Sequence, residues 1–243
     1  HTDFSEATYR PLLAAACAVM VIAAAKGVGP QTKQLFKVCV MRHIPIFTFI
    51  TKMDREATPP LDLLQDIEDV LGIETYAMNW PIGSGRDFKG VYQRGDEEIL
   101  TFDAVVRGTK QVQAHKAKIG DEGLDSLIGE AAHKQLAEDI ELLDVAGTGF
   151  DEDALLHGKQ TPVFFGSVVA NFGVETFLEA FLRLTPPPLA GMASEGIVDP
   201  MGDDFSAFVF KIQANRNPDH RDRIAFLRIC SGRFEKGMEV FHM

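Results

Sequence analysis

Three short runs of apolar residues, rich in β-branched and aromatic side chains, stand out along the chain. They cover residues 19–22, 44–50 and 162–165. Uninterrupted apolar runs of this length are typical of parallel strands whose two faces are both covered. We therefore predict three buried strands that belong to one parallel sheet.

Apolar residues recur at helical spacing in three segments, residues 30–43, 58–72 and 174–184. In the second of these, the hydroxyl of Thr58 is a candidate N-cap followed by two prolines, and Gly72 is a candidate stop signal. Because helices alternate with the predicted strands, the pattern indicates βαβ units and an α/β fold.

The region between the second and third predicted strands is too long for a simple connection. Residues 80–102 read as short strands and turns, and residues 124–145 as one long amphipathic helix. We interpret these elements as an α+β subdomain inserted at about residues 74–160.

The composition changes after the last predicted helix. Residues 191–204 contain glycine, proline and acidic residues without periodicity, and we interpret them as a linker. Residues 205–243 alternate as strands do and contain two glycine turns, which predicts the start of a small β-barrel domain. The sequence thus predicts a first domain at 1–190, the linker, and the beginning of a second domain.

Composition and charge narrow the functional classes. Of 243 residues, 46% are hydrophobic, and the formal net charge is −11, so a globular protein without a broad nucleic-acid-binding surface is expected. No apolar run is long enough to span a bilayer. The three widely spaced cysteines indicate reduced thiols in a cytoplasmic protein. The histidines show no spacing with cysteines or carboxylates that defines a metal site, and we predict none.

The segment Thr51-Lys52-Met53-Asp54 follows the second predicted strand directly, at the end where open parallel sheets hold ligands. A carboxylate there can accept hydrogen bonds from the N1–H and the exocyclic amine of guanine, a pattern that adenine lacks. The stem of Lys52 can lie over the base. An ordinary solvated turn is the alternative interpretation.

A second polar turn, Gly166-Ser167-Val168, follows the third predicted strand. Its backbone N–H groups could meet the guanine carbonyl, although such turns usually serve only to reverse the chain. The two motifs on successive parallel strands are more specific than either motif alone. Together they resemble the guanine-specificity motif NKxD and the later SA motif of translational GTPases.

Longer segments narrow the resemblance to the release factor 3 family of bacterial translational GTPases. They are the segments at 80–92, 161–167 and 208–226, the last containing FVFKIQAN and HRDRIAF. Elongation factor G shares only the first type, so an elongation factor G-like translocase is the weaker alternative. The resemblance implies a P-loop GTPase sheet in which the strand near residues 19–25 lies at an edge, next to the strands at 44–51 and 162–167.

The same resemblance implies ligands and partners. It implies binding of GTP and GDP, Mg²⁺ in the intact family protein, and action on the ribosome to recycle stop-codon-reading release factors. It implies a cytoplasmic protein with neither membrane nor DNA partners. The guanine-binding residues would be Thr51, Lys52, Asp54 and the turn 166–168, and His1 would orient the attacking water.

Two departures from the family pattern bear on activity. No G-x-x-x-x-G-K-[ST] string occurs in the 243 residues, and Thr51 stands where the family usually has Asn. We expect the phosphate loop and the magnesium ligands of the family to lie outside this chain, which alone would not hydrolyse GTP. A non-catalytic guanine-binding or interaction module is therefore a further alternative.

Overall fold

The computed structural model describes residues 5–102, 114–188, 190–194, 196–214 and 223–241. The chain divides into two compact units, one formed by residues 17–185 and the other by residues 1–16 together with 186–243. The predicted guanine-binding residues all lie in the first of these units.

The centre of the larger unit is a four-stranded parallel sheet in the order β1-β2-β8-β3. Its strands are β1 (Ala18–Ala23), β2 (Ile46–Thr51), β8 (Gln160–Phe165) and β3 (Glu74–Ala77). The three predicted strands are neighbours, as expected, and every residue of β2 and β8 is buried. Strand β3 was not predicted, because its sequence Glu-Thr-Tyr-Ala has no apolar run; residues 74–77 therefore belong to the sheet and not to the insertion.

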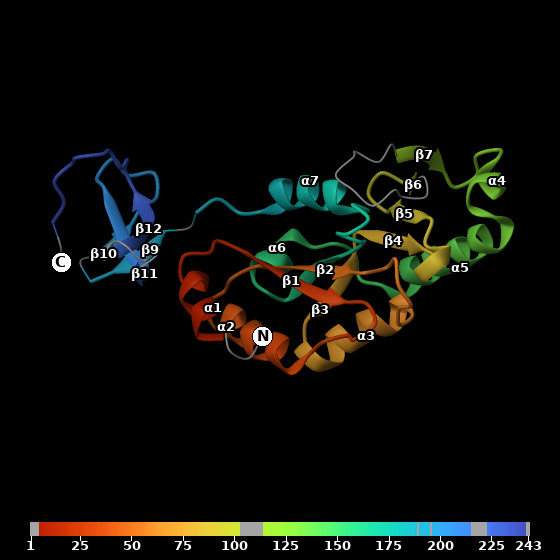
Figure 1. The fold of residues 1–243 in the computed structure, drawn as a ribbon, viewed down its shortest axis with the longest axis horizontal. Coiled ribbons are helices and arrows are strands. Elements are labelled where there is room, and N and C mark those ends of the chain that lie inside the picture. Colours follow the sequence, from red (N-terminus) through yellow and green to blue (C-terminus); the bar gives the residue numbers. More distant parts are fainter. Residues whose placement is uncertain (1–4, 103–113, 189, 195, 215–222, 242–243) are drawn as a thin grey trace. The chain divides into compact units, whose positions relative to one another are not determined.

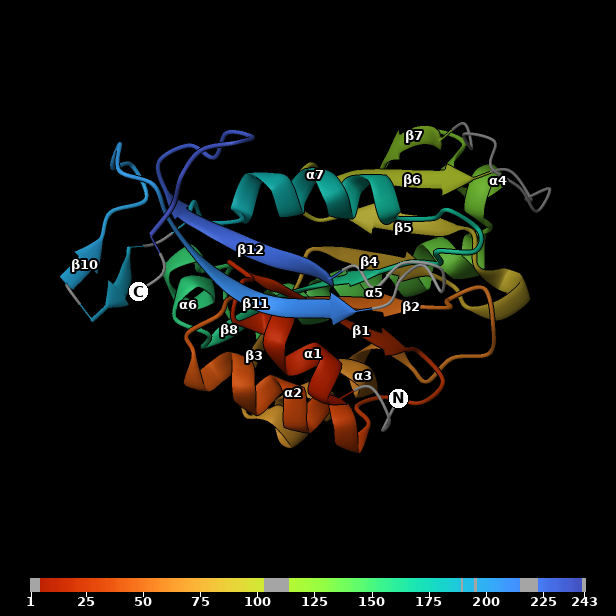
Figure 2. The same ribbon diagram turned by 60° about the vertical axis from the view of Figure 1, so that its left-hand side comes forward.

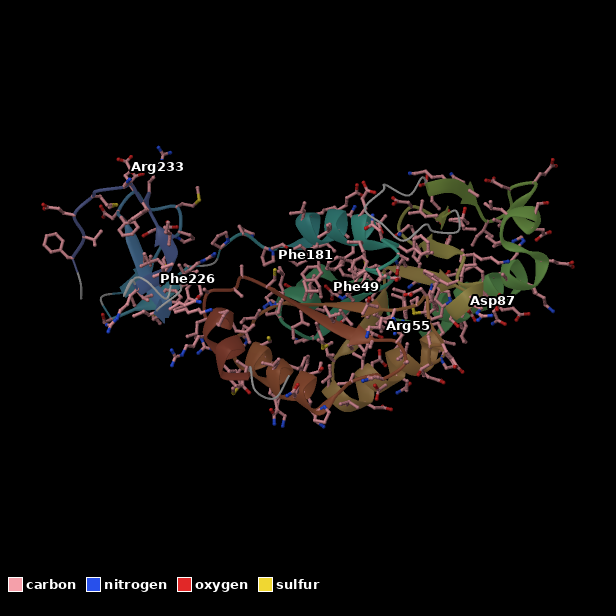
Figure 3. All side chains as sticks on the ribbon, in the orientation of Figure 1. Phe49, Arg55, Asp87, Phe181, Phe226 and Arg233 are labelled. Atoms are coloured by element: carbon pink, nitrogen blue, oxygen red, sulfur yellow. The ribbon has the colours of Figure 1, made fainter. Side chains whose placement is uncertain are left out.

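Helices cover both faces of this sheet (Figure 1). Helices α2 (Pro30–Met41) and α3 (Pro60–Leu71) lie on one face, and α6 (Glu152–Leu156) and α7 (Val174–Leu184) lie on the other. The α7 face is an aromatic core in which Phe49 and Phe164 pack against Phe177 of the helix. Figure 3 labels Phe49 and Phe181 in this layer.

The predicted helices at residues 30–43, 58–72 and 174–184 are confirmed, with one local correction. Gly72 ends α3 in the left-handed conformation, as expected. The predicted Thr58 cap is wrong, since the N-cap residue is Pro59 and no side chain caps the helix. The backbone N–H of Thr58 instead donates to the carbonyl of Ala24, which ties the start of α3 to the end of β1.

The inserted region forms a second sheet, which is antiparallel and has the order β4-β5-β6-β7. Its strands are β4 (Asn79–Ile82), β5 (Gly90–Gln93), β6 (Glu98–Phe102) and β7 (Ala114–Lys118), with a short 3-10 turn, η2 (Gly85–Asp87), before β5. Helices α4 (Leu124–Ile128) and α5 (Glu130–Ala146) follow (Figure 2). The single long helix predicted here is wrong, because Gly129 at φ 85° separates α4 from α5.

The other unit contains α1 (Ser5–Leu12) and two antiparallel hairpins. One hairpin pairs β9 (Gly191–Ala193) with β10 (Gly196–Val198), so the predicted linker contains strands that its irregular pattern did not reveal. The other pairs β11 (Ser206–Ala214) with β12 (Arg223–Ser231). This longer hairpin fits the start of a β-barrel, and the predicted α/β fold class is confirmed.

The three cysteines are free thiols. Burial raises the pKa of Cys39, and it also raises the pKa of Cys17, where a hydrogen bond with Thr185 partly opposes the effect. Both groups are therefore neutral thiols near pH 7, as expected of reduced cysteines packed in a core.

Strand β1 is an edge strand within the described sheet, and one of its faces is open. Val19 is 40% exposed and Val21 is 59% exposed, whereas Ile22 on the opposite face is buried. The apolar runs predict that all three strands are covered on both faces. This prediction is confirmed for β2 and β8. It is wrong for β1, because α7 does not cover the face that carries Val19 and Val21.

This open edge predicts self-association of the isolated chain, because unpaired backbone groups and exposed valines favour pairing with another strand. We expect light scattering to show species larger than the 26.7 kDa chain. Val21→Lys should shift the distribution toward the monomer, and the exposed Val145→Lys on α5 should not. A monodisperse wild-type monomer with a cooperative melt would contradict this prediction.

Candidate functional site

The candidate site forms where β2 and β8 end side by side. The two strands pair in parallel up to Ile50 opposite Phe165. Beyond that pair the backbone continues to hydrogen-bond, since the Gly166 N–H donates to the Ile50 carbonyl at 2.9 Å and the Met53 N–H to the Gly166 carbonyl at 3.2 Å. The two predicted motifs are thus joined by their main chains before any side chain is considered.

Asp54 and Ser167 form the polar contact at the centre of the site. The Ser167 hydroxyl donates to the Asp54 Oδ1 at 2.5 Å, and Ser167 is fully buried. Within the described part of the chain, the second carboxylate oxygen of Asp54 has no hydrogen-bond partner. The serine therefore holds the carboxylate in one orientation, with one oxygen unpaired and with Oδ1 still able to accept a second hydrogen bond.

The turn after β8 is closed by its own hydrogen bonds. Ser167 and Phe172 exchange backbone hydrogen bonds of 3.0 and 2.8 Å, and the Ala170 N–H donates to the Ser167 hydroxyl. Gly166 is required by close approach, since a Cβ there would lie 2.3 Å from the Phe172 carbonyl oxygen. These hydrogen bonds define the conformation of the turn, and the close approach requires glycine at position 166.

Only part of this turn can offer N–H groups to a ligand. The N–H groups of Gly166 and Ser167 are used within the fold, which corrects the expectation that all three residues could donate. The N–H of Val168 has no partner among the described residues, and its side chain is exposed. Val168 is thus the one donor of the predicted set that remains available.

The remaining predicted residues have different environments. Thr51 is buried at the end of β2, where its carbonyl accepts from the Ala24 N–H at 3.0 Å. Lys52 is exposed and has φ 69°, a conformation that non-glycine residues adopt rarely and that concentrates at ligand sites. Met53 is fully buried, so it anchors the loop from which Lys52 and Asp54 extend.

A cavity of about 420 Å³ lies beside Asp54. Its lining is Asp54, Arg55, Glu56, Ser84, Gly85 and Arg86. Arg55 is labelled in Figure 3. The second half of this lining, residues 84–86, lies just after β4 and includes the start of η2, and this segment is not among the predicted site residues. The glycines on either side of Ser84 are the only sequence signal for this segment.

Other predicted features lie away from this site or outside the described residues. His1 falls in the segment that the structure does not describe. Among the residues described, no cluster of three or more histidine, cysteine or carboxylate side chains is arranged to hold a metal ion. None of the described helices combines the length and apolarity needed to cross a membrane.

Comparison with known families identifies the class of protein to which this fold and site belong. The family model of the elongation factor Tu GTP-binding domain matches residues 1–187, so the chain belongs to that family of GTP-binding domains. The model of elongation factor G domain 2 matches residues 204–243. A crystal structure of a protein from Thermus thermophilus covers 98% of this chain, and this chain covers 35% of that one, with a TM-score of 0.68. At 22% identity, this likeness shows the fold alone.

Similarity to individual proteins is more specific than the family models, and the proteins matched here are named peptide chain release factor 3. The chain is 55% identical to that of Symbiobacterium thermophilum over 100% of its own length, 52% to that of Gloeobacter violaceus over 100%, and 54% to that of Ligilactobacillus salivarius over 99%. It spans 46% of the length of each of these relatives. The resemblance to release factor 3 is confirmed, and that to elongation factor G is weaker.

The Ser167–Asp54 hydrogen bond predicts a measurable contribution to stability. Ser167→Ala removes a buried donor to a carboxylate and the acceptor for the Ala170 N–H, so we expect the free energy of unfolding to fall by about 1–3 kcal/mol. Ser84→Ala, on the exposed cavity loop, should change it by less than about 0.5 kcal/mol. Urea denaturation measures both. Equal effects of the two substitutions would show that the buried hydrogen bond contributes little.

Proposed function

We propose that this chain carries the guanine-recognition part of a release factor 3-type translational GTPase. One observation carries the proposal: Asp54, at the end of β2, is oriented by Ser167 at the end of the neighbouring β8. The family match supplies the class, and the hydrogen bond supplies a carboxylate suited to read a base.

The available groups match the edge of guanine. The Asp54 carboxylate would accept from the N1–H and the exocyclic amine, and the Val168 N–H would donate to the carbonyl at position 6. Adenine presents no N1–H and no carbonyl, so it would leave both protein groups unpaired. The aliphatic stem of Lys52 would cover a face of the base.

Thr51 is the weakest part of this proposed site. Its single hydroxyl cannot replace the amide of the asparagine usual in the family, which donates and accepts at once. Thr51 is also buried at the end of β2. In our proposal, recognition therefore rests on Asp54 and Val168, with Thr51 in a structural position.

The relatives also support a proposal for the wider function. We propose that the protein acts in the cytoplasm on the ribosome, where a cycle of GTP binding and hydrolysis removes stop-codon-reading release factors. His1 would orient the water, and Mg²⁺ would neutralise phosphate charge when bound. The described residues contribute recognition of the base to this cycle.

Two alternative functions use the same fold or the same base site. An elongation factor G-like translocase would share the fold, but the relatives matched at 50–55% identity are named release factor 3. A non-catalytic module would use the same base site without hydrolysis. The binding of guanine is common to both alternatives, so it is the first property to test.

Asp54→Asn provides a direct test of base recognition. An asparagine amide still accepts from N1–H but donates where the carboxylate accepted, which suits the carbonyl that xanthine carries in place of the amine of guanine. We expect guanosine binding to weaken by about 10-fold or more and xanthosine binding to strengthen. Asp153→Asn, at the exposed start of α6, is the matched control. An unchanged guanosine preference in the Asp54 variant would refute the base site.

The contribution of phosphate contacts can be tested on the same chain. Triphosphate affinity in this class comes from a backbone cradle, its lysine and Mg²⁺, and the 243 residues contain no such loop sequence. We expect guanosine, GDP and GTP to bind within about threefold of one another, without hydrolysis. Calorimetry with and without Mg²⁺ checks this. Micromolar, magnesium-dependent binding of GTP would show that another part of the chain holds the phosphates.

A further inference from the structure

One buried side chain of the inserted region hydrogen-bonds to the end of β8, beside the candidate site. Asn79, the first residue of β4, is fully buried. Its Oδ1 accepts from the Phe165 N–H at 2.7 Å, and its Nδ2 donates to the Phe165 carbonyl at 3.1 Å. One amide thus satisfies both backbone groups of the last residue of β8.

The end of β8 needs this side chain because its neighbouring strand stops early. Strand β3 pairs with β8 only as far as Ala77 opposite Val163, and the Met78 N–H then donates to the Val163 carbonyl. Phe165, two residues further on, is not paired with β3, and among the described residues no other strand continues the ladder on that edge. Asn79 replaces the missing strand, so the backbone groups of Phe165 stay paired in the interior.

Phe165 is also the residue from which the guanine-site turn begins. On its other edge β8 is tied to β2 by the Gly166 N–H and the Ile50 carbonyl. Ser167, two residues after Phe165, orients the Asp54 carboxylate. A displacement of Phe165 would therefore shift Ser167, and with it the hydrogen bond that orients the Asp54 carboxylate.

A second contact from the insertion holds the other half of the site. The Gly85 N–H donates to the Met53 carbonyl at 2.8 Å, within the loop that carries Asp54. Strand β4 is itself anchored, because the Trp80 ring packs edge-on against Phe165 and its Nε1 donates to Asp139 of α5 at 2.9 Å. The insertion thus supports both loops from a fixed strand.

We propose that Asn79 is a positioning residue for guanine recognition, through which the inserted subdomain sets the geometry of the Ser167–Asp54 pair. This inference rests on the proposed guanine site. In this proposal the insertion contributes to the affinity for the nucleotide. Asn79 acts through Phe165 and Ser167 and does not touch the base.

The test compares two buried residues that form hydrogen bonds near opposite ends of β8. One is Asn79 of β4, and the other is Thr161 of β8 itself. Asn79→Leu removes the amide at the site end of the strand. Thr161→Val removes a hydroxyl that is equally buried at the far end, where it bonds to Thr48 and to the Ile46 carbonyl. Both substitutions nearly preserve volume. Because each removes buried hydrogen bonds, both should lower the melting temperature.

Guanosine and adenosine are then titrated into each protein well below its melting temperature, with the Val168 amide resonance as the NMR probe. We expect Asn79→Leu to weaken guanosine binding about tenfold and to reduce the preference over adenosine, whereas Thr161→Val stays within about twofold of wild type. If Asn79→Leu does not fold, Asn79→Asp is used. It keeps an acceptor for the Phe165 N–H but opposes the carbonyl, and it should show a smaller loss in the same direction.

The outcomes separate this inference from the proposed function. A wild-type chain that does not prefer guanosine to adenosine defeats the guanine site itself. If the wild-type chain prefers guanosine and the Asn79 variant binds it with unchanged affinity, the positioning role alone is refuted. An equal loss in Thr161→Val would also overturn it, because general destabilisation would then explain both results.

Discussion

The parallel pairing of β2 with β8 is the constraint on which the rest of the site depends. It places Asp54 and Ser167, which are 113 residues apart in the chain, within one hydrogen bond of each other. Both strands are completely buried, and a slip of their register would break the buried hydrogen bond between Thr48 and Thr161. A loop carboxylate thereby acquires a fixed orientation, which an exposed turn would not provide.

The insertion completes this arrangement at the edge where the parallel sheet is short. Strand β3 ends before β8 does, and Asn79 takes over the pairing of the last residue. Ser84 and the first residues of η2 line the cavity beside Asp54. The opposite edge, formed by β1, has no such cover in the described residues, and its valines remain exposed. The two edges of one sheet therefore differ in how their unpaired groups are satisfied.

The sequence revealed the elements whose pattern follows from burial or from turn chemistry. Buried strands such as β2 are uniformly apolar, and α7 carries a clear apolar stripe, so their positions followed from periodicity. Asp54 and Ser167 could be paired because the short motif that contains each of them lies at the end of a predicted strand. Strand β3 was missed, since its pairing is made by backbone groups that any sequence possesses. Asn79 was missed for a related reason: its partner lies 86 residues away, and no local pattern marks a buried amide.

A crystal structure of this chain with guanosine bound would test the account most directly. We predict that the base lies at the ends of β2 and β8, with N1 and the exocyclic amine within hydrogen-bonding distance of Asp54 and the carbonyl facing the Val168 N–H. The Ser167–Asp54 hydrogen bond would remain in place. A base bound elsewhere on the chain, or bound here with Asp54 turned away from it, would contradict the account.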